Sequence, residues 1–307
     1  MTEAPTVPVL ASRRLQAARL AERGILVLLF ASATVATVTT AAIFLTLLTN
    51  GFQFFAAVDM AEFLFGTTWA PDFLPRQYGS VPLLKGTIQV AVGASLIGIP
   101  LGVGSALYLS EFAGDRTRRV LKPTLELLAG IPSIVFGLLA LFVIGPFIQS
   151  TFHAPLFTAL SASLALGVMV VPIISSISDD ALRAVPRELR EGALALGATK
   201  WEATWKVVLP AARSGITAAT ILGFSRAIGE TMVVTLAAGL VPTMTWDYLE
   251  PAQTITSFIA NRAGGDLPDG SIQYRSIFAI GAYLFALTFA VNLAAEFILA
   301  RYRRRFA

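Results

Sequence analysis

The sequence has 307 residues, of which 55% are hydrophobic and only 14% charged, and its mean hydropathy is +0.72. The apolar content is too high for a disordered chain, and the absence of cysteine excludes disulfide-stapled folds and thiolate metal sites. A single histidine also argues against an imidazole metal site, so an integral membrane protein remains. The net charge of +4 is informative only when the charged residues are assigned to the two sides of the membrane.

Long stretches with few or no charges predict six membrane-spanning helices, because a helix needs about 20 apolar residues to cross a bilayer core about 30 Å thick. The first stretch follows Arg23 and is too long for the apolar part of a signal peptide. Residues 127–178 hold no charge over a length sufficient for two spans, which a polar dip around Gln149 separates. The predicted spans lie near residues 24–48, 87–110, 124–148, 157–178, 215–240 and 277–300.

Lysine and arginine are concentrated on one side of these six helices. Eighteen of the 23 basic residues lie in the N-terminal segment 1–23, the loop 116–122, the loop 183–213 and the tail 301–307. Since cytoplasmic loops carry an excess of basic residues, this side is predicted to be cytoplasmic, with both termini on it. The positive charge therefore reflects topology in a multi-pass protein of the cell membrane, surrounded by lipid, and indicates no nucleic-acid partner.

The outer loop 49–85 is long and rich in aromatic residues, which either form an interfacial belt or offer a docking surface. Pro100, Pro132 and Pro172 are predicted inside the second, third and fourth helices. Such prolines reflect either ordinary packing or the flexing of a gated pathway. Glycines that allow close approach of helices flank the first of them, at Gly98, Gly102 and Gly104.

The fourth loop predicts a helix–glycine–helix element against the cytoplasmic face of the membrane. Pro186 suits the first position of a helix, and Gly197 is a natural C-terminal stop. Thr199 then begins a second helix, and Glu202 three residues later completes a capping box. The second helix is expected to end just before Pro210.

This loop resembles a motif of the permease subunits of binding-protein-dependent ABC importers: Glu-Ala-Ala, three residues, Gly, nine residues, Ile, one residue, Leu-Pro. The matching residues are Glu191, Gly192, Ala193, Gly197, Val207, Leu209 and Pro210, with glycine in place of alanine at 192 and valine in place of isoleucine at 207. The resemblance implies the all-α fold of a type I importer permease, with its core at residues 86–300. It also implies that the element at about 185–210 couples the subunit to an ATPase. The alternative is an amphipathic element that merely lies on the membrane.

The sequence contains no phosphate-binding loop of the G-x-x-x-x-G-K-[ST] type and no Gly-Lys pair at all. We therefore expect a transport subunit and not an enzyme, with no catalytic residues, no bound metal and no cofactor of its own. ATP and Mg²⁺ are expected to be used by a partner ATPase.

Arg226 is the only basic residue inside a predicted span, and Glu230 follows four residues later, on the same face of the predicted helix. The two form either a local salt bridge, which lowers the cost of both charges, or a pathway site, where the guanidinium meets an oxyanion. The two roles are compatible. Asp179 and Asp180 are expected only to cap the start of the cytoplasmic loop.

The sequence around Arg226 resembles the permeases of phosphate-specific ABC importers. The similar segments are residues 223–234, which read GFSRAIGETMVV, and residues 127–138 and 185–199; residues 69–87 look like the C-type subunit rather than the A-type subunit. The resemblance implies that Arg226 and Glu230 are required for phosphate translocation. It also implies a complex with a homologous A-type permease, two ATP-binding subunits and an extracytoplasmic phosphate-binding protein.

Several alternatives remain open from the sequence. The chain is alternatively an A-type phosphate permease subunit, or a permease for sulfate or molybdate. From a different class, a passive anion channel or a sensor-only membrane subunit would share the six spans, although the coupling motif argues against the channel.

Overall fold

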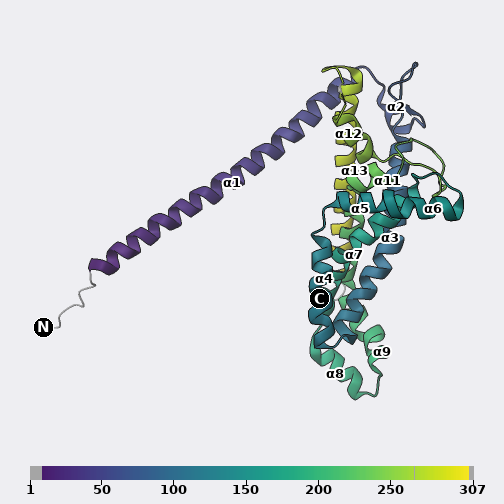
Figure 1. Cartoon of the computed structure of the whole chain (residues 1–307). Coiled ribbons are helices and arrows are strands. Elements are labelled where there is room, and N and C mark those ends of the chain that lie inside the picture. The colour runs from purple at the N-terminus through teal and green to yellow at the C-terminus, as the bar shows by residue number, and fades with distance from the viewer. Residues whose placement is uncertain (1–8, 266, 304–307) are drawn as a thin grey trace. The chain divides into compact units, whose positions relative to one another are not determined.

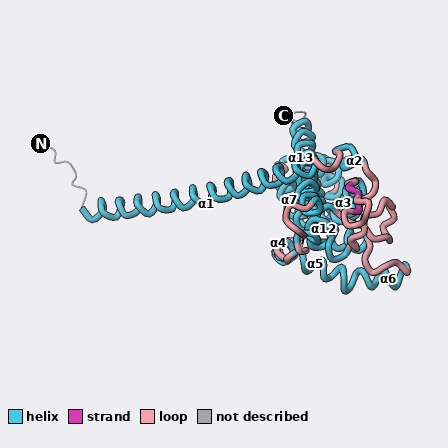
Figure 2. Tube along the Cα trace, turned by 90° about the horizontal axis from the view of Figure 1, so that it is seen from above, coloured by secondary structure: helices cyan, strands magenta, loops and turns pink. Residues whose placement is uncertain are grey.

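The computed structural model describes residues 9–265 and 267–303, and this part of the chain is mainly helical (Figures 1 and 2). Arg304 and Arg305 of the predicted basic tail lie outside the described residues. Within the described part, six helical segments are long and apolar enough to span a membrane, which confirms the predicted number. These segments are Glu22–Phe55, Val81–Phe112, Ser133–Phe152, Ala159–Arg183, Lys200–Ile228 and Ile272–Ala294.

The chain divides into two units, residues 1–50 and 51–307, and helix α1 (Val9–Phe55) supplies the described part of the first. Residues 22–46 of α1 are exposed all round, as suits a helix that faces lipid. Its hydroxyl groups bond back to the carbonyl four residues earlier; Thr34 Oγ1, for example, donates to Phe30 O at 2.8 Å. Such bonds satisfy polar groups that lipid would leave without a partner.

An aromatic cluster forms the core of one end of the second unit. It is built by the end of α1, α2 (Met60–Phe65), β1 (Trp69–Ala70), β2 (Gln77–Tyr78) and α12 (Ile255–Ala263). The two strands are antiparallel and pair Trp69 with Tyr78. Trp69 and Phe258 are both buried, with ring centroids 4.9 Å apart. The interpretation as an interfacial belt is therefore wrong for the buried residues such as Trp69 and Tyr78, because they pack against one another inside the protein. For Phe52 and Phe73, which are 73% and 75% exposed, it stays a prediction.

The helical core lies where α3 (Val81–Leu107), α7 (Ala159–Arg183), α10 (Leu209–Ile228) and α11 (Met232–Ala237) meet. Glycine permits the closest contacts between α3 and α7. A Cβ atom on Gly98 would lie 2.4 Å from Val170 Cγ2, and one on Gly102 would lie 2.7 Å from Ile174 Cβ. Gly104, by contrast, has open space around it, so two of the three glycines serve close approach.

The third span begins later than predicted. Residues 115–129 form a separate amphipathic helix, α4 (Asp115–Ala129), and the span starts with α5 (Ser133–Leu139). It continues through the π-helical turn η2 (Ala140–Ile144) into α6 (Gly145–Phe152). Pro132 has extended backbone, with φ −56° and ψ 136°, and lies before α5 instead of inside a helix, whereas Pro100 and Pro172 do lie inside α3 and α7. The charges of α4 favour an aqueous boundary over lipid, which explains the error.

The fifth span differs from the prediction at both ends. Helix α9 (Lys200–Ala203), the π-helical turn η3 (Thr204–Val208) and α10 form one continuous helix, so the expected end before Pro210 is wrong. Pro210 lies in the first turn of α10, after η3 has shifted the pairing so that Leu209 N donates to Thr204 O. A proline costs little at such a position. The helix then stops at Ile228, so the predicted span 215–240 is broken.

The remaining elements complete the arrangement of the second unit. Helix α8 (Arg187–Ala195) precedes α9, the π-helical turn η1 (Tyr108–Phe112) extends α3, and α13 (Ile272–Arg303) follows α12. Figure 1 shows α8 and α9 at one end of the unit and α2 and α12 at the other. Two sets of candidate residues therefore lie in different parts of the molecule.

Candidate functional site

Arg226 and Glu230 form an ion pair at a break in the fifth span. Arg226 lies in the last turn of α10, which ends at Ile228, and Glu230 lies in the short link before α11. The predicted pair is therefore present, but its two residues are not on one helix as expected. Arg226 Nη1 donates to Glu230 Oε2 at 2.5 Å.

Glu230 is a fixed member of this pair. Its other carboxylate oxygen, Oε1, accepts hydrogen bonds from the backbone N–H groups of Met232 at 3.1 Å and Val233 at 3.3 Å. These are the first backbone donors of α11, so the carboxylate caps that helix. Thr256 Oγ1 also donates to the backbone carbonyl of Glu230 at 2.6 Å. Contacts on three sides thus hold Glu230 in place.

The two members of the pair differ in exposure. The side chain of Glu230 is 2% exposed, whereas that of Arg226 is 41% exposed. Arginine carries five N–H donors in a planar fork, and the bond to Glu230 occupies only part of that capacity. Glu230 thus holds the guanidinium of Arg226 in place while some of its N–H donors remain exposed. Such donors suit a planar or tetrahedral oxyanion.

The predicted helix–glycine–helix element is present at the other end of the second unit. Helix α8 begins directly after Pro186, and Gly197 has a φ of +86°, which glycine adopts without strain. Glu202 N donates to Thr199 Oγ1 at 3.2 Å, and Thr199 N donates to Glu202 Oε2 at 3.0 Å. The capping box is therefore confirmed, and it sets the direction of α9.

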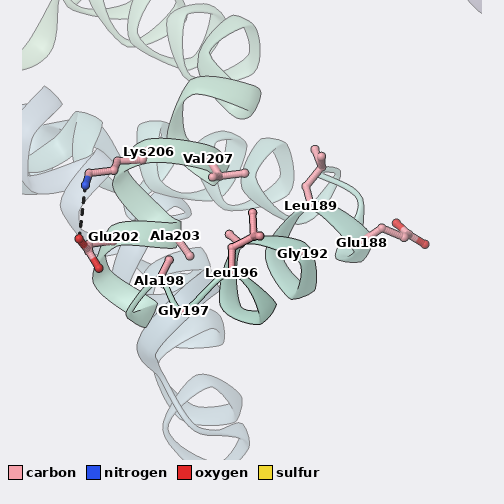
Figure 3. Close-up of a pocket in the computed structure, with 11 residues that line it drawn as sticks. Glu188, Leu189, Gly192, Leu196, Gly197, Ala198, Glu202, Ala203, Lys206 and Val207 are labelled. Carbon is pink, nitrogen blue, oxygen red and sulfur yellow. Dashed lines mark hydrogen bonds and ion pairs between the residues drawn. The ribbon is translucent and has the colours of Figure 1, made fainter.

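A groove of about 590 Å³ lies between α8 and the start of the fifth span (Figure 3). The matched motif lines it with Gly192, Ala193 and Gly197. Glu191 is exposed on α8 without lining the groove, and Leu209 and Pro210 lie apart from it at the start of α10. Leu196, at the turn between the helices, is 91% exposed. Leu196 also lines the groove, together with Leu189 and Val207.

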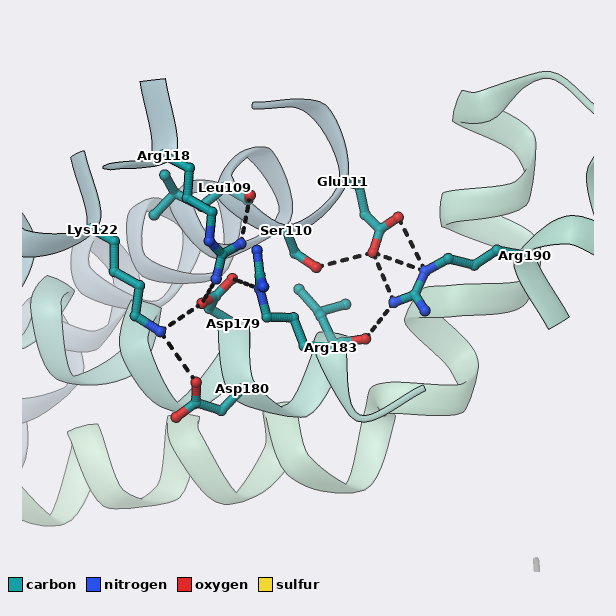
Figure 4. Close-up of polar contacts among 10 residues, drawn as sticks. Leu109, Ser110, Glu111, Arg118, Lys122, Asp179, Asp180, Arg183 and Arg190 are labelled. Carbon is teal, nitrogen blue, oxygen red and sulfur yellow. Dashed lines mark hydrogen bonds and ion pairs between the residues drawn. The ribbon is translucent and has the colours of Figure 1, made fainter. Parts of the chain in front are cut away.

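Arg190 fastens α8 to the ends of two spans (Figure 4). Its guanidinium donates to Glu111 in η1 at 3.1 Å, and to the carbonyls of Leu182 in the last turn of α7 and Val185 just after it, each at 2.6 Å. The side chains of Arg190 and Glu111 are 21% and 8% exposed. These contacts join α8 directly to the ends of α3 and α7.

A second charged cluster joins α4 to α7 (Figure 4). Buried Asp179 accepts hydrogen bonds from Arg118 at 2.7 Å and Lys122 at 3.1 Å, and Arg183 lies 3.4 Å away. Burial alone would lower the pKa of Lys122, but its hydrogen bond with Asp179 and the charges of Asp179 and Asp180 outweigh that effect and raise its pKa. The expected capping role of Asp179 is wrong, because α7 continues to Arg183.

Comparison with known proteins gives a family for this architecture. Residues 98–304 match the family described as binding-protein-dependent transport system inner membrane component. The chain is similar to the phosphate transport system permease protein PstC of Xylella fastidiosa (strain 9a5c), with 37% identity over 80% of each chain. It is also similar to the probable ABC transporter permease protein YqgH of Bacillus subtilis (strain 168), with 34% identity over 80% of this chain and 79% of that one.

Solved structures agree with this at the level of the fold. A chain of the inward-facing MetNI methionine ABC transporter has a TM-score of 0.54 and 21% identity, over 73% of this chain and 94% of that one. A chain of a bacterial ABC transporter for alginate import also has a TM-score of 0.54, with 16% identity over 72% and 79% of the two chains. The predicted fold is thereby confirmed as that of a type I ABC importer permease. The chain belongs to the family of inner membrane components of binding-protein-dependent transport systems, as a multi-pass membrane subunit.

Proposed function

We propose that this chain is the C-type permease subunit of an ATP-driven phosphate importer and forms half of its translocation pathway. The observation that carries the proposal is the ion pair in the broken fifth span, in which a buried acid anchors an accessible arginine. The similarity to permease proteins named for phosphate transport supports phosphate as the anion.

The geometry of the pair suits passage rather than storage of an anion. Phosphate oxygens accept hydrogen bonds from the exposed N–H groups of Arg226, while Glu230 keeps the guanidinium at the break between α10 and α11. The nearby carboxylate also weakens the hold of Arg226 on phosphate, because two anions compete for one cation. A transport site must bind well enough to admit the ion and weakly enough to release it.

The subunit requires partners to use this site. We propose a homologous A-type permease as the other half of the pathway, two ATP-binding subunits that hydrolyse ATP with Mg²⁺, and an extracytoplasmic phosphate-binding protein. Both termini face the cytoplasm in this arrangement. The groove between α8 and α9 receives the ATPase, and the bond between Arg190 and Glu111 passes its movement to α3.

The test is uptake of labelled phosphate by the complete transporter in proteoliposomes. Uptake is expected to need both ATP and the binding protein, and Arg226→Gln is expected to abolish uptake while assembly persists. Arg116→Gln, which removes an exposed arginine from α4, is the matched control. Uptake retained by Arg226→Gln would remove the site assignment.

The same assay separates the other candidate functions. Unlabelled sulfate and molybdate are added in excess, and neither is expected to compete with phosphate. Uptake without ATP would indicate a passive channel, and binding-protein-stimulated ATP hydrolysis without uptake of any of the three anions would indicate a sensor.

A further inference from the structure

Lys85 is an unpaired cation buried at the outer end of the second span. It is the fifth residue of α3, and 4% of it is exposed. Its Nζ atom has no hydrogen-bond partner, and among the lysine and arginine side chains that the structure describes it is the only buried one. A buried ammonium without an anion is strongly unfavourable, so its presence needs an explanation.

The usual structural roles of lysine do not explain this position. A lysine that anchors a helix at the membrane interface extends its ammonium into water, but this Nζ is buried. A positive charge near the start of a helix also opposes the helix dipole. The face of Trp246 lies 5.9 Å from Nζ, and Trp246 is itself 59% exposed, so this contact compensates only part of the charge.

Lys85 lies beside the segment that holds Glu230. A Cβ atom on Gly86 would lie 2.2 Å from the backbone oxygen of Gln253, and Ile255 N donates to Thr87 Oγ1 at 3.0 Å. Residues 253–256 thus pack on α3 directly after Lys85, and the last of them, Thr256, donates to the Glu230 carbonyl. The residues next to Lys85 in α3 and the backbone of Glu230 therefore contact the same four-residue segment.

Charge balance gives Lys85 a role in transport. Arg226 and Glu230 together carry no net charge, whereas a phosphate group carries about one to two negative charges near neutral pH. Phosphate at that pair alone would leave uncompensated negative charge in a region of low dielectric. We propose that Lys85 is an anion-binding residue of the pathway, which takes phosphate on the outer side of Arg226 and supplies the missing positive charge. The proposal rests on the proposed function in phosphate import.

The first test compares three variants of the complete transporter in proteoliposomes. Lys85→Met removes the charge and keeps the length of the side chain, Lys85→Arg keeps the charge, and Arg76→Met removes an exposed outer cation as a control. Phosphate uptake is expected to fall at least about tenfold in Lys85→Met, in line with the loss of a charge-assisted contact. Lys85→Arg and Arg76→Met are expected to stay within about threefold of the wild type, which is well below that effect.

The second test restores the charge chemically. The sequence contains no cysteine, so Lys85→Cys introduces the only thiol of this chain. Reaction with an aminoethyl methanethiosulfonate adds an ammonium group, and reaction with the methyl reagent adds none. Uptake is expected to recover with the first reagent only, and saturating phosphate-loaded binding protein with ATP is expected to change the rate of labelling.

Several results would overturn the proposed role of Lys85. Near-normal uptake by Lys85→Met, or equal recovery with both reagents, would overturn the proposal. So would loss of assembly in every uncharged variant, which would assign the charge to folding. Weaker binding of the loaded binding protein to Lys85→Met would overturn it in favour of a carboxylate from a partner. Absence of phosphate uptake in the wild type would instead remove the proposed function.

Discussion

The ion pair of the fifth span and the charged clusters around Glu111 and Asp179 use the same residue types in different ways. In the span, the acid is buried and the cation is accessible, with Glu230 2% and Arg226 41% exposed. At the other end, Arg190 is 21% exposed and is bound by a carboxylate and two carbonyls together. The first arrangement leaves donors free for a mobile anion, and the second uses its donors to join helices. Because the acid is the more buried partner in both regions, the two ion pairs differ in how many donors of the arginine are already bonded, not in which partner is accessible.

The largest expected effect comes from removing the anchor in the span. Glu230→Gln leaves Arg226 without its counter-ion and weakens the cap of α11, and loss of one partner of such a pair costs about 2–5 kcal/mol. Phosphate uptake is expected to be lost. Labelled phosphate uptake in proteoliposomes measures this, and Glu250→Gln, on the outer loop, is the matched control. Uptake close to normal would mean that Arg226 needs no anchor.

A slightly smaller effect is expected when the guanidinium is changed but the charge is kept. Arg226→Lys retains a positive charge and loses the planar fork, so one ammonium must serve both Glu230 and the anion. Uptake is expected to fall about tenfold, by the loss of one hydrogen bond to a charged group. If Arg226→Lys is as inactive as Arg226→Gln, then fork geometry is essential and charge alone is insufficient.

Substitution of Arg190 is expected to lower the ratio of phosphate transported to ATP hydrolysed rather than to abolish uptake. Arg190→Ala frees α8 from η1 and from the end of α7, so ATP hydrolysis is expected to continue while uptake per ATP falls several-fold, in keeping with the loss of contacts to charged groups. The ratio of phosphate transported to ATP hydrolysed measures this. Arg187→Ala, on the same helix but exposed, is the control. An unchanged ratio would show that Arg190 does not carry the movement.

Exchanging the two charged residues tests the same contact between Glu111 and Arg190. Glu111→Arg combined with Arg190→Glu restores opposite charges across η1 and α8 but loses the two carbonyl contacts of Arg190. Partial recovery of the ratio is expected relative to either single change. No recovery would assign the effect to the carbonyl contacts alone.

The smallest effect is expected at Lys122. Lys122→Met leaves Asp179 bound to Arg118 at 2.7 Å, so the loss of thermal stability is expected to be about 1 kcal/mol or less. Because the pKa of Lys122 is raised, its contribution is complete below its ordinary value of 10.5 and is lost only as the pH rises through the raised value. The difference from wild type should therefore be constant between about pH 6 and 9. Melting curves in detergent test this, and a difference that varies within that range would contradict it.

The sequence predicted those features that depend on local pattern. Six spans follow from apolar length, the turn at Gly197 and the capping box of Thr199 follow from short-range spacing, and the pairing of Arg226 with Glu230 follows from their separation by four residues. Each of these features is decided within one or two helical turns, which is the range in which sequence pattern is informative.

The features that the sequence analysis missed depend on contacts between distant segments. Arg190 and Glu111 lie 79 residues apart, and no motif marks either of them. The aromatic residues of the loop 49–85 were interpreted as an interfacial belt or a docking surface, because composition does not show that Trp69 packs against Phe258. The helix was expected to end before Pro210, but it continues through a π-helical turn that the flanking sequence does not indicate. Tertiary packing overrides local propensity in all three cases.

The continuous helix from Lys200 to Ile228 has a mechanical consequence. It has 29 residues and, at about 1.5 Å per residue, a length of about 43 Å. Its first turns line the groove of the coupling motif, and its last turn carries Arg226. In the proposed function, the contact with the ATPase and the arginine that meets phosphate thus lie at the two ends of one helix. If the ATPase tilts this helix at the groove, we expect Arg226 to move relative to Glu230, which lies beyond the end of the helix, so that the ion pair loosens as the path opens.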